Sequence, residues 1–244
     1  MPIKCVSYIC LSDPGGSPSN PGFLEGRADV QGTVEGFTHG PVIPVLAFLV
    51  AGLGAALGLR STVRSPRTAR SFRTGRLALG ALSIGSGIWT MHYVAMTGFT
   101  VVEAPLSHDK PHVIAGLAVA VVTSGTGLFI VGYRGATRMA VITGGALTGL
   151  GIASTHYLGM AGIRFGGHFT YDTPLVVLSV LIAAAAATAA LRAALSTRAF
   201  LSGLGAGAMM AVAVTGMHYT GMAALGVQLH PSAPGVTSHH LPPD

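Results

Sequence analysis

The sequence predicts an all-α membrane protein in which six transmembrane helices form three helical hairpins. Charged residues make up only 9% of the 244 residues, and 50% are hydrophobic, whereas a typical soluble domain carries about 25% charged residues. The chain also contains six long uncharged runs, and one motif recurs in every second run. So few charges exclude an ordinary soluble enzyme, because they cannot cover the surface of a globular domain of this size.

Each uncharged run predicts one helix. The runs contain 18 to 29 residues, and about 20 residues are needed for a helix to cross the hydrocarbon core of a membrane. None shows the alternating pattern of a membrane β-barrel strand. A proline lies near the start of the first, third and fifth runs. In chain order the predicted helices are Val42–Leu59, Leu77–Val102, Val113–Tyr133, Met139–Ile163, Pro174–Leu191 and Ala199–Val227.

The charges between the runs predict the topology. Ten of the fourteen basic residues lie in or beside the first, third and fifth loops, with no acid among them. All eight acids lie in the other loops and in the two tails. The positive-inside rule therefore predicts a multi-pass protein of the cell membrane, with the Arg-rich loops in the cytoplasm and both termini outside. The ten basic residues are Arg60, Arg64, Arg67, Arg70, Arg73, Arg76, Arg134, Arg138, Arg192 and Arg198.

The ends of the chain predict tails on either side of one membrane domain. Residues 1–38 are rich in Gly, Pro and Ser and are expected to be disordered, residues 39–227 form the membrane domain, and residues 228–244 form a short outer tail. Cys5 and Cys10 lie in the first tail without a CxxC spacing, which leaves their role open. The net charge of +6 is explained by the topology and by contact with anionic membrane lipids. No nucleic-acid-binding module accompanies this charge, so we expect no nucleic acid partner.

A short motif, His-Tyr-x-x-Met, recurs in the second, fourth and sixth runs. It begins at His92, at His156 and at His218, after intervals of 64 and 62 residues. The repeating unit is therefore a hairpin of about 60 residues. Three hairpins of the same orientation indicate parallel repeats about a pseudo-threefold axis along the membrane normal, which would bring the three motifs together.

The motif places metal-ligating side chains on one helical face. Residues at i and i+4 lie only about 40° apart around a helix, so each His projects in the same direction as the Met four residues later. The three histidines are expected roughly 10–15 Å inside the outer ends of their helices. Ionisable groups at such depth are costly and are functional by default. The predicted metal ligands are His92, Met96, His156, Met160, His218 and Met222.

Imidazole combined with thioether favours copper. Met thioether is soft and selects Cu(I), and neutral His suits copper, zinc, iron and nickel. The runs contain no carboxylate for a hard cation and no Cys for structural zinc. A haem with His or Met axial ligands is the nearest alternative. His39, His108, His112 and His168 lie at the outer ends of the runs, where they could cap or guide a metal or simply be solvated.

At these residues the chain resembles the MHYT family, named for Met-His-Tyr-Thr. The match is literal at Met217-His218-Tyr219-Thr220, near at Met91-His92-Tyr93-Val94 and partial at Thr155-His156-Tyr157-Leu158. The resemblance covers residues 38–227 and implies an integral membrane sensor domain that binds copper and through it senses oxygen, carbon monoxide or nitric oxide. Thr155 replaces the first Met of the second copy. Besides the six ligands, the resemblance marks Met91, Tyr93, Tyr157, Met217 and Tyr219.

The resulting hypothesis is a copper-binding membrane sensor and not an enzyme. Many MHYT proteins continue into a cytoplasmic signalling domain, whereas this chain ends 17 residues after its sixth run, so we expect a separate cytoplasmic signalling partner. No nucleophile–base constellation or intramembrane carboxylate suggests catalysis. Two alternatives stay open, a small copper transporter and a haem-binding membrane redox protein. The glycine pairs Gly54/Gly58, Gly145/Gly149 and Gly203/Gly207 have GxxxG spacing, which permits close packing within the bundle or between copies.

Overall fold

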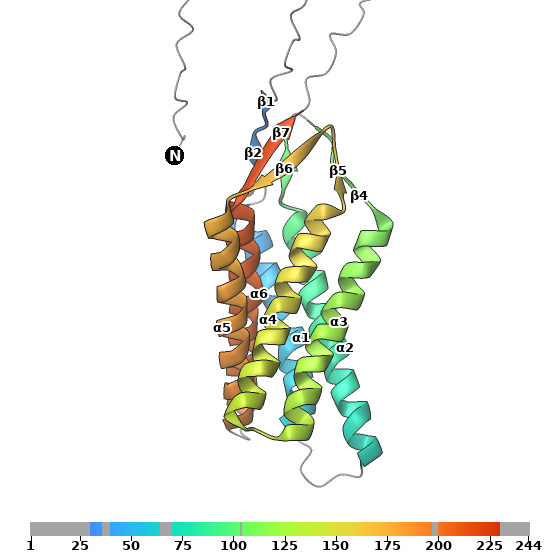
Figure 1. Cartoon of the computed structure of the whole chain (residues 1–244), viewed down its shortest axis with the longest axis vertical. Coiled ribbons are helices and arrows are strands. Elements are labelled where there is room, and N and C mark those ends of the chain that lie inside the picture. Colours follow the sequence, from blue (N-terminus) through green and yellow to red (C-terminus); the bar gives the residue numbers. More distant parts are fainter. Residues whose placement is uncertain (1–29, 36–39, 64–69, 103, 197–199, 230–244) are drawn as a thin grey trace, which may run out of the picture.

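A computed structural model describes residues 30–35, 40–63, 70–102, 104–196 and 200–229 of the chain. Within these ranges the fold is a bundle of six helices, and each predicted run overlaps one of them, so the predicted helical class is confirmed (Figure 1). The helices are α1 (Val42–Val63), α2 (Arg70–Met96), α3 (Lys110–Arg134), α4 (Arg138–Ala161), α5 (Thr173–Ser196) and α6 (Phe200–Ala223).

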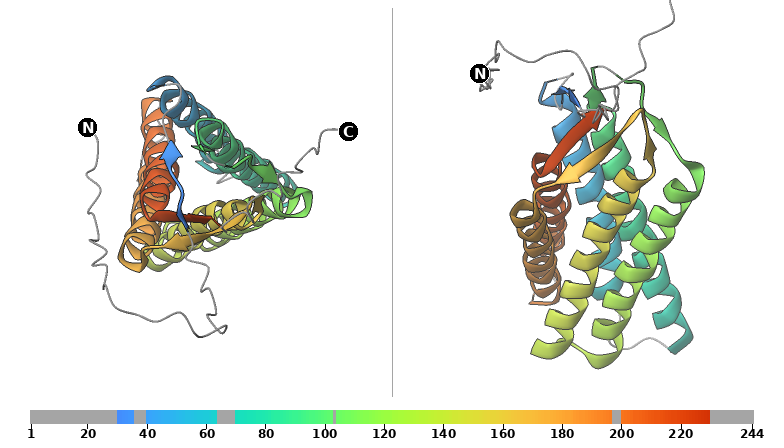
Figure 2. Two further views of the ribbon diagram at one scale, coloured as in Figure 1. Left: turned by 90° about the horizontal axis from the view of Figure 1, so that it is seen from above. Right: turned by 45° about the horizontal axis from the view of Figure 1, so that its top comes forward.

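The six helices form a closed ring. Each helix packs on the one before and the one after it in the chain, and α6 closes the ring against α1. Seen from one end, the helices outline a triangle (Figure 2). The even-numbered helices α2, α4 and α6 also approach one another across the centre of the ring. This arrangement is the pseudo-threefold closure that the repeated motif predicts.

Glycine allows neighbouring helices to approach closely. A Cβ atom added at Gly54 in α1 would lie 2.9 Å from the Cα atom of Gly87 in α2, and one added at Gly207 in α6 would lie 2.8 Å from the Cβ atom of Ala56 in α1. Gly149 in α4 meets the backbone of Ala184 in α5 in the same way. Each predicted GxxxG pair therefore has a glycine packed inside the bundle, where only a residue without Cβ fits.

Seven short strands within the described ranges cover one end of the bundle, and the sequence did not predict them. β6 (Gly167–Tyr171) and β7 (Leu225–Leu229) pair antiparallel, and β1 (Val30–Gln31) joins the free side of β7. Two further pairs join β2 (Val34–Glu35) to β3 (Thr100–Val101) and β4 (Ser107–His108) to β5 (Ile163–Arg164). The seven strands form what we call the strand cap (Figure 1).

The strand cap explains why two predicted helices end early. The second was expected to reach Val102 and the sixth Val227, but α2 ends at Met96 and α6 ends at Ala223. The chain beyond α2 pairs with β2, and the chain beyond α6 pairs with β6 and β1. Strand pairing satisfies backbone groups that a further helical turn would otherwise satisfy.

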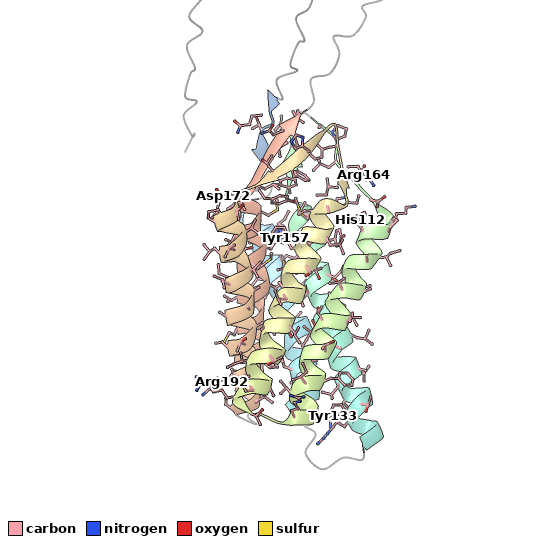
Figure 3. The ribbon with its side chains drawn as sticks, viewed as in Figure 1. His112, Tyr133, Tyr157, Arg164, Asp172 and Arg192 are labelled. Atoms are coloured by element: carbon pink, nitrogen blue, oxygen red, sulfur yellow. The ribbon has the colours of Figure 1, made fainter. Side chains whose placement is uncertain are left out.

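The two ends of the bundle differ in charge. Figure 3 shows Asp172, His112 and Arg164 at the capped end, and Arg192 at the opposite end. Arg60, Arg134 and Arg138 also lie at helix ends away from the strand cap. We refer to this side as the arginine end.

Three helices are long and apolar enough to cross a membrane by length and composition. They are the odd-numbered ones, over Val42–Arg60, Lys110–Arg134 and Thr173–Ser196. The even-numbered helices are of similar length but carry the His, Thr and Gly residues of the motif. Alternate helices of the ring therefore have the length and the composition needed to cross a membrane.

The predicted tails are only partly described. Residues 30–35, expected to be disordered, contribute β1 and β2, and residues 228 and 229 end β7. The remainder of both tails, with Cys5 and Cys10, lies outside the described residues, and so does His39 at the start of the predicted membrane domain.

Candidate metal centre

Three histidines from three helices meet at the centre of the bundle. His92 in α2, His156 in α4 and His218 in α6 are 2%, 3% and 2% exposed. Their ring centroids lie 4.8 to 5.3 Å apart. One ligand nitrogen from each ring lies within 4.8 Å of the other two. These residues, which we call the histidine triad, are brought together as the motif predicts.

The triad leaves ligand atoms without a partner. Nδ1 of His156 and Nδ1 of His218 are 3.1 Å apart and share a hydrogen bond, in which one ring donates and the other accepts. Nδ1 of His92 and Nε2 of His156 are buried and have no hydrogen-bond partner within the described part of the chain. Buried polar atoms are nearly always satisfied. A bound metal ion would satisfy such a set, so these residues fit a metal site.

A small buried cavity lies against the triad. Its volume is about 10 Å³, close to the smallest space that holds a single water molecule. Each even-numbered helix contributes its His, the residue before it and the residue four positions before it. All nine lining side chains are buried: Ile88, Met91, His92, Ile152, Thr155, His156, Val214, Met217 and His218.

The cavity brings two unexpected thioethers close to the triad. Met91 and Met217 line it, and Thr155 occupies the equivalent position in α4. The sequence marked both methionines by family resemblance but not as ligands, because Thr155 replaces this Met in the second copy and because this Met points about 140° away from the later Met on a helix. Where three helices converge on one axis, two successive residues of each helix can border the same space. The sequence signal for these two methionines is that each directly precedes a motif His.

The three later methionines lie in a separate cluster. Met96 and Met160 are buried and Met222 is partly buried, and they pack with Phe99, Val101 and Val227 under the strand cap. Each lies one helical turn beyond its His in the direction of the cap. The three predicted His ligands and the three predicted Met ligands therefore form two consecutive layers along the axis of the bundle. Thioethers lie on both sides of the imidazole layer, since Met91 and Met217 also line the cavity.

Small residues set the position of the rings. A Cβ atom added at Gly159 in α4 would meet Nε2 of His92, and one added at Gly221 in α6 would lie 2.7 Å from Nε2 of His156. Each glycine follows the motif His of its own helix by three positions. The rings of His92 and His156 thus each lie against the next even-numbered helix, at a glycine of that helix.

The motif tyrosines do not line the cavity. Tyr157 contacts the following odd-numbered helix, and Tyr93 packs on His108 of the cap. The Ser179 hydroxyl in α5 donates to the Val176 carbonyl, so Tyr157 donates to Ser179 Oγ at 2.9 Å. Tyr93 lies 5.0 Å from Trp89, whose Nε1 donates to the Val113 carbonyl in α3. Tyr219 packs against His218 at 5.1 Å. Tyr157 therefore links α4 to α5, and Trp89 links α2 to α3.

The outer histidines occupy several different surroundings. Nδ1 of His112 lies 2.5 Å from Oδ2 of Asp109 at the start of α3, and His168 is exposed on β6. His108 on β4 packs edge to face with Tyr93, with ring centroids 5.8 Å apart. None of the three belongs to the triad.

Comparison with known proteins supports the repeated motif. A family model described as "Bacterial signalling protein N terminal repeat", MHYT, matches residues 85–144 and 149–207. Each match runs from within one even-numbered helix, through the next odd-numbered helix, into the following even-numbered one. The third motif, at His218, lies beyond the second match. No solved structure matches the chain.

Curated relatives match most of the chain. The bifunctional diguanylate cyclase/cyclic di-GMP phosphodiesterase MucR of Pseudomonas aeruginosa is 36% identical over 77% of this chain and 28% of its own length. The cyclic di-GMP phosphodiesterase NbdA of the same organism is 35% identical over 86% of this chain and 27% of its own length. The signalling protein YkoW of Bacillus subtilis is 30% identical over 64% and 20%. The chain thus spans about a quarter of the relatives that it matches.

Proposed function

Since the chain belongs to the MHYT family of bacterial signalling proteins, we propose that it is a copper-binding membrane sensor. It senses either a diatomic gas (O₂, CO or NO) or a change of redox state. The observation that carries the proposal is the histidine triad, because three buried imidazoles on three helices converge with nitrogens left unpartnered within the described residues. The family of signalling relatives supports the sensory role.

The donor set supports copper as the metal. Imidazole suits copper, zinc, iron and nickel, and the thioethers of Met91 and Met217 beside the cavity favour the soft Cu(I) ion. The described helices contain no Asp, Glu or Cys, the residues that would favour hard cations or structural zinc. His92, His156 and His218 would hold the ion, with Met96, Met160 and Met222 as the outer thioether layer. Bound copper would supply a redox-active centre with affinity for small gases.

The size of the cavity supports an ion over a haem. A space of about 10 Å³ between imidazoles about 5 Å apart accommodates an ion and no porphyrin.

The half of the bundle between the triad and the arginine end supports metal binding over metal transport. Among the described residues, the buried side chains of that half include no ionisable group: most are apolar, such as Leu59, Leu77 and Leu128, and the polar ones are Ser124 and Thr148. An ion relay through the membrane would need ionisable groups there.

The proposed signal runs from the outside to the cytoplasm. The positive-inside rule places the arginine end in the cytoplasm, with all six helices crossing the membrane and the strand cap and both termini outside. A change in ligation at the triad moves α2, α4 and α6 relative to one another and shifts their arginine ends. A separate cytoplasmic partner reads that shift, and membrane lipids surround the exposed apolar faces of the helices.

Metal analysis of the purified protein tests the proposal. The wild-type protein is expected to contain copper at near-integral stoichiometry, and a His92→Ala/His156→Ala/His218→Ala variant is expected to lose it. A second variant with Asn at the three positions preserves more side-chain volume and guards against loss of the fold. His112→Ala, which removes a histidine outside the triad, is the matched control and is expected to retain the copper. Equal copper content in the wild type and both triad variants would contradict the proposal, and a Soret band would indicate haem.

A further inference from the structure

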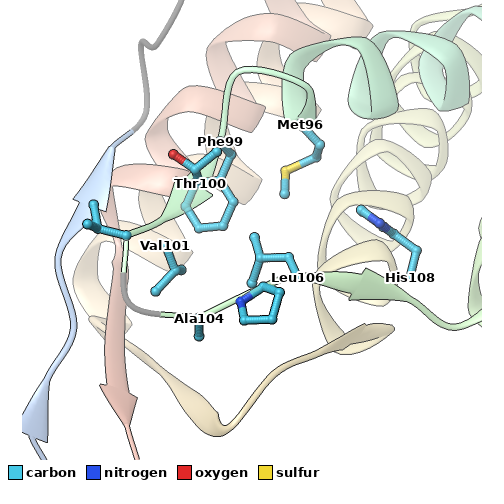
Figure 4. A pocket seen from close by; sticks show the side chains of 9 residues that line it. Met96, Phe99, Thr100, Val101, Ala104, Leu106 and His108 are labelled. Atoms are coloured by element: carbon cyan, nitrogen blue, oxygen red, sulfur yellow. The ribbon is translucent and has the colours of Figure 1, made fainter.

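A second pocket opens at the capped end, between the end of α2 and strand β4. Its volume is about 500 Å³. Phe99, Val101 and Leu106 form much of an apolar wall. Two residues with metal-ligating atoms, Met96 and His108, also line the pocket, and Figure 4 shows both side chains pointing into it. The pocket thus combines a thioether and an imidazole in apolar surroundings.

Met96 links the outer pocket to the thioether layer that lies next to the triad. Met96 lies four residues after His92, on the same face of α2 and one turn nearer the cap. It also packs in the cluster that contains Met160 and Met222, the other two methionines of that layer. Met96 therefore borders the outer pocket and belongs to the thioether layer that separates the pocket from the imidazoles.

Comparison of the repeats shows that His108 is specific to one of them. His108 lies two residues before the start of α3 and packs on Tyr93, with ring centroids 5.8 Å apart. Tyr171 lies two residues before the start of α5 and packs on Tyr157 at 5.7 Å. The same position before α1 is Gly40.

The residues at the other two equivalent positions, Tyr171 and Gly40, are poor metal ligands. Burial, together with the neighbouring Tyr157, raises the pKa of Tyr171 to about 12, so its phenol stays protonated at physiological pH and offers no phenolate. Gly40 has no side chain. An imidazole is placed above a motif tyrosine at only one of these three equivalent positions, and that position borders the pocket.

We propose that this pocket is an outer loading site for a soft monovalent cation, Cu(I), bound by the Met96 thioether and the His108 imidazole. The inference rests on the proposed function of the triad and adds the route by which its metal arrives. The ion passes inward by ligand exchange, in which the bond to His108 breaks as the bond to His92 forms. Neither ligand nor ion changes its oxidation state, and no proton is transferred. A soft thioether together with an imidazole is a ligand set that suits Cu(I).

The outer site is tested separately from the triad with Ag(I), a redox-silent soft cation. In the His92→Ala/His156→Ala/His218→Ala background, Ag(I) is expected to bind at the pocket, measured by competition with a chromophoric chelator. Adding His108→Ala or Met96→Leu is expected to weaken this binding by about tenfold or more. His108 is exposed, so its loss leaves the fold intact, and Met96→Leu keeps an apolar side chain of similar size. His112→Ala is the matched control and is expected to bind Ag(I) as its parent does.

Loading of the intact protein provides the second measurement. With the triad present, His108→Ala is expected to slow uptake of Cu(I) from a chelator by about tenfold while the final copper content stays at the wild-type value. Equal Ag(I) affinity or equal loading rate in the His108→Ala and His112→Ala variants would overturn the loading site. Failure of the proposed function is a different result, in which the wild type holds no more copper than the triad variant.

Discussion

The odd-numbered and even-numbered helices of the ring have different tasks. The odd-numbered helices are apolar enough to cross a membrane, and α1 exposes a row of large side chains that includes Val45, Leu49 and Leu53. Five of the seven buried polar side chains of the described residues lie on the even-numbered helices: His92, Thr148, Thr155, His156 and His218. The apolar surface and the polar site are thus supplied by alternate helices.

This division explains how the polar side chains of the even-numbered helices are kept in the interior of an apolar helical bundle. Each even-numbered helix packs between two odd-numbered ones, so its imidazole faces the central axis and not the lipid. Intramembrane polar residues are tolerated where they face the interior of a bundle. If this comparison is correct, changes at the contacts between odd and even helices affect stability, changes around the triad affect metal binding, and changes on the outer surface affect neither.

The largest effect is expected where an even-numbered helix packs on an odd-numbered one. Gly149→Ala places a Cβ atom against the backbone of Ala184 in α5, and backbone atoms cannot move aside as a flexible side chain can. We expect a loss of about 1–3 kcal/mol in the free energy of unfolding, seen as a lower thermal midpoint in detergent. A Cβ atom at Gly205 in α6 meets nothing within 4 Å, so Gly205→Ala is the control. It is expected to be neutral or stabilising, because Ala favours helix over Gly by up to about 1 kcal/mol.

A smaller and more selective effect is expected next to the triad. Gly159→Ala directs a Cβ atom at Nε2 of His92, so the ring must shift from the position that it holds relative to the other two imidazoles. We expect copper affinity to fall about tenfold, equivalent to about 1.4 kcal/mol, with the thermal midpoint of the metal-free protein changed less than by Gly149→Ala. Titration with a Cu(I) chelator measures the affinity.

The matched control for this variant is Gly216→Ala in α6, one residue before Met217. Its Cβ atom would lie at an ordinary 3.4 Å from Cγ2 of Ile182, so it should leave copper affinity unchanged. If Gly159→Ala and Gly216→Ala bound copper equally well, the absence of a side chain at position 159 would not control the ring of His92.

Much of the fold was predictable from where the charges lie. Scarcity of charge outlines each helix whatever its polarity, which is why the even-numbered helices were predicted although His156 and its Thr and Gly neighbours lower their hydropathy. The strand cap was not predictable. β2 and β3 contain two residues each, too few for an alternating pattern, and they form only because distant segments meet at the end of the bundle.

The candidate site shows the same limit. The His-Tyr-x-x-Met repeat predicted the triad, because matched depth and matched face follow from helix geometry. The position of Met91 beside the cavity depends on how α2 approaches the axis, and the outer pocket depends on β4 returning over α2 to place His108. Such tertiary placement leaves no periodic signal in the sequence.

The smallest effect is expected on the outer surface, where odd and even helices should behave alike. Leu53 in α1 and Leu204 in α6 are 64% and 55% exposed. Because these side chains have few contacts to lose, Leu53→Ala and Leu204→Ala are expected to change the free energy of unfolding by no more than about 0.5 kcal/mol and to leave copper content unchanged. Thermal unfolding and metal analysis of the two variants, measured in parallel, check both expectations. A loss of copper in Leu204→Ala alone would show that the outer face of an even-numbered helix also supports the site, and the separation between apolar surface and metal centre would then fail.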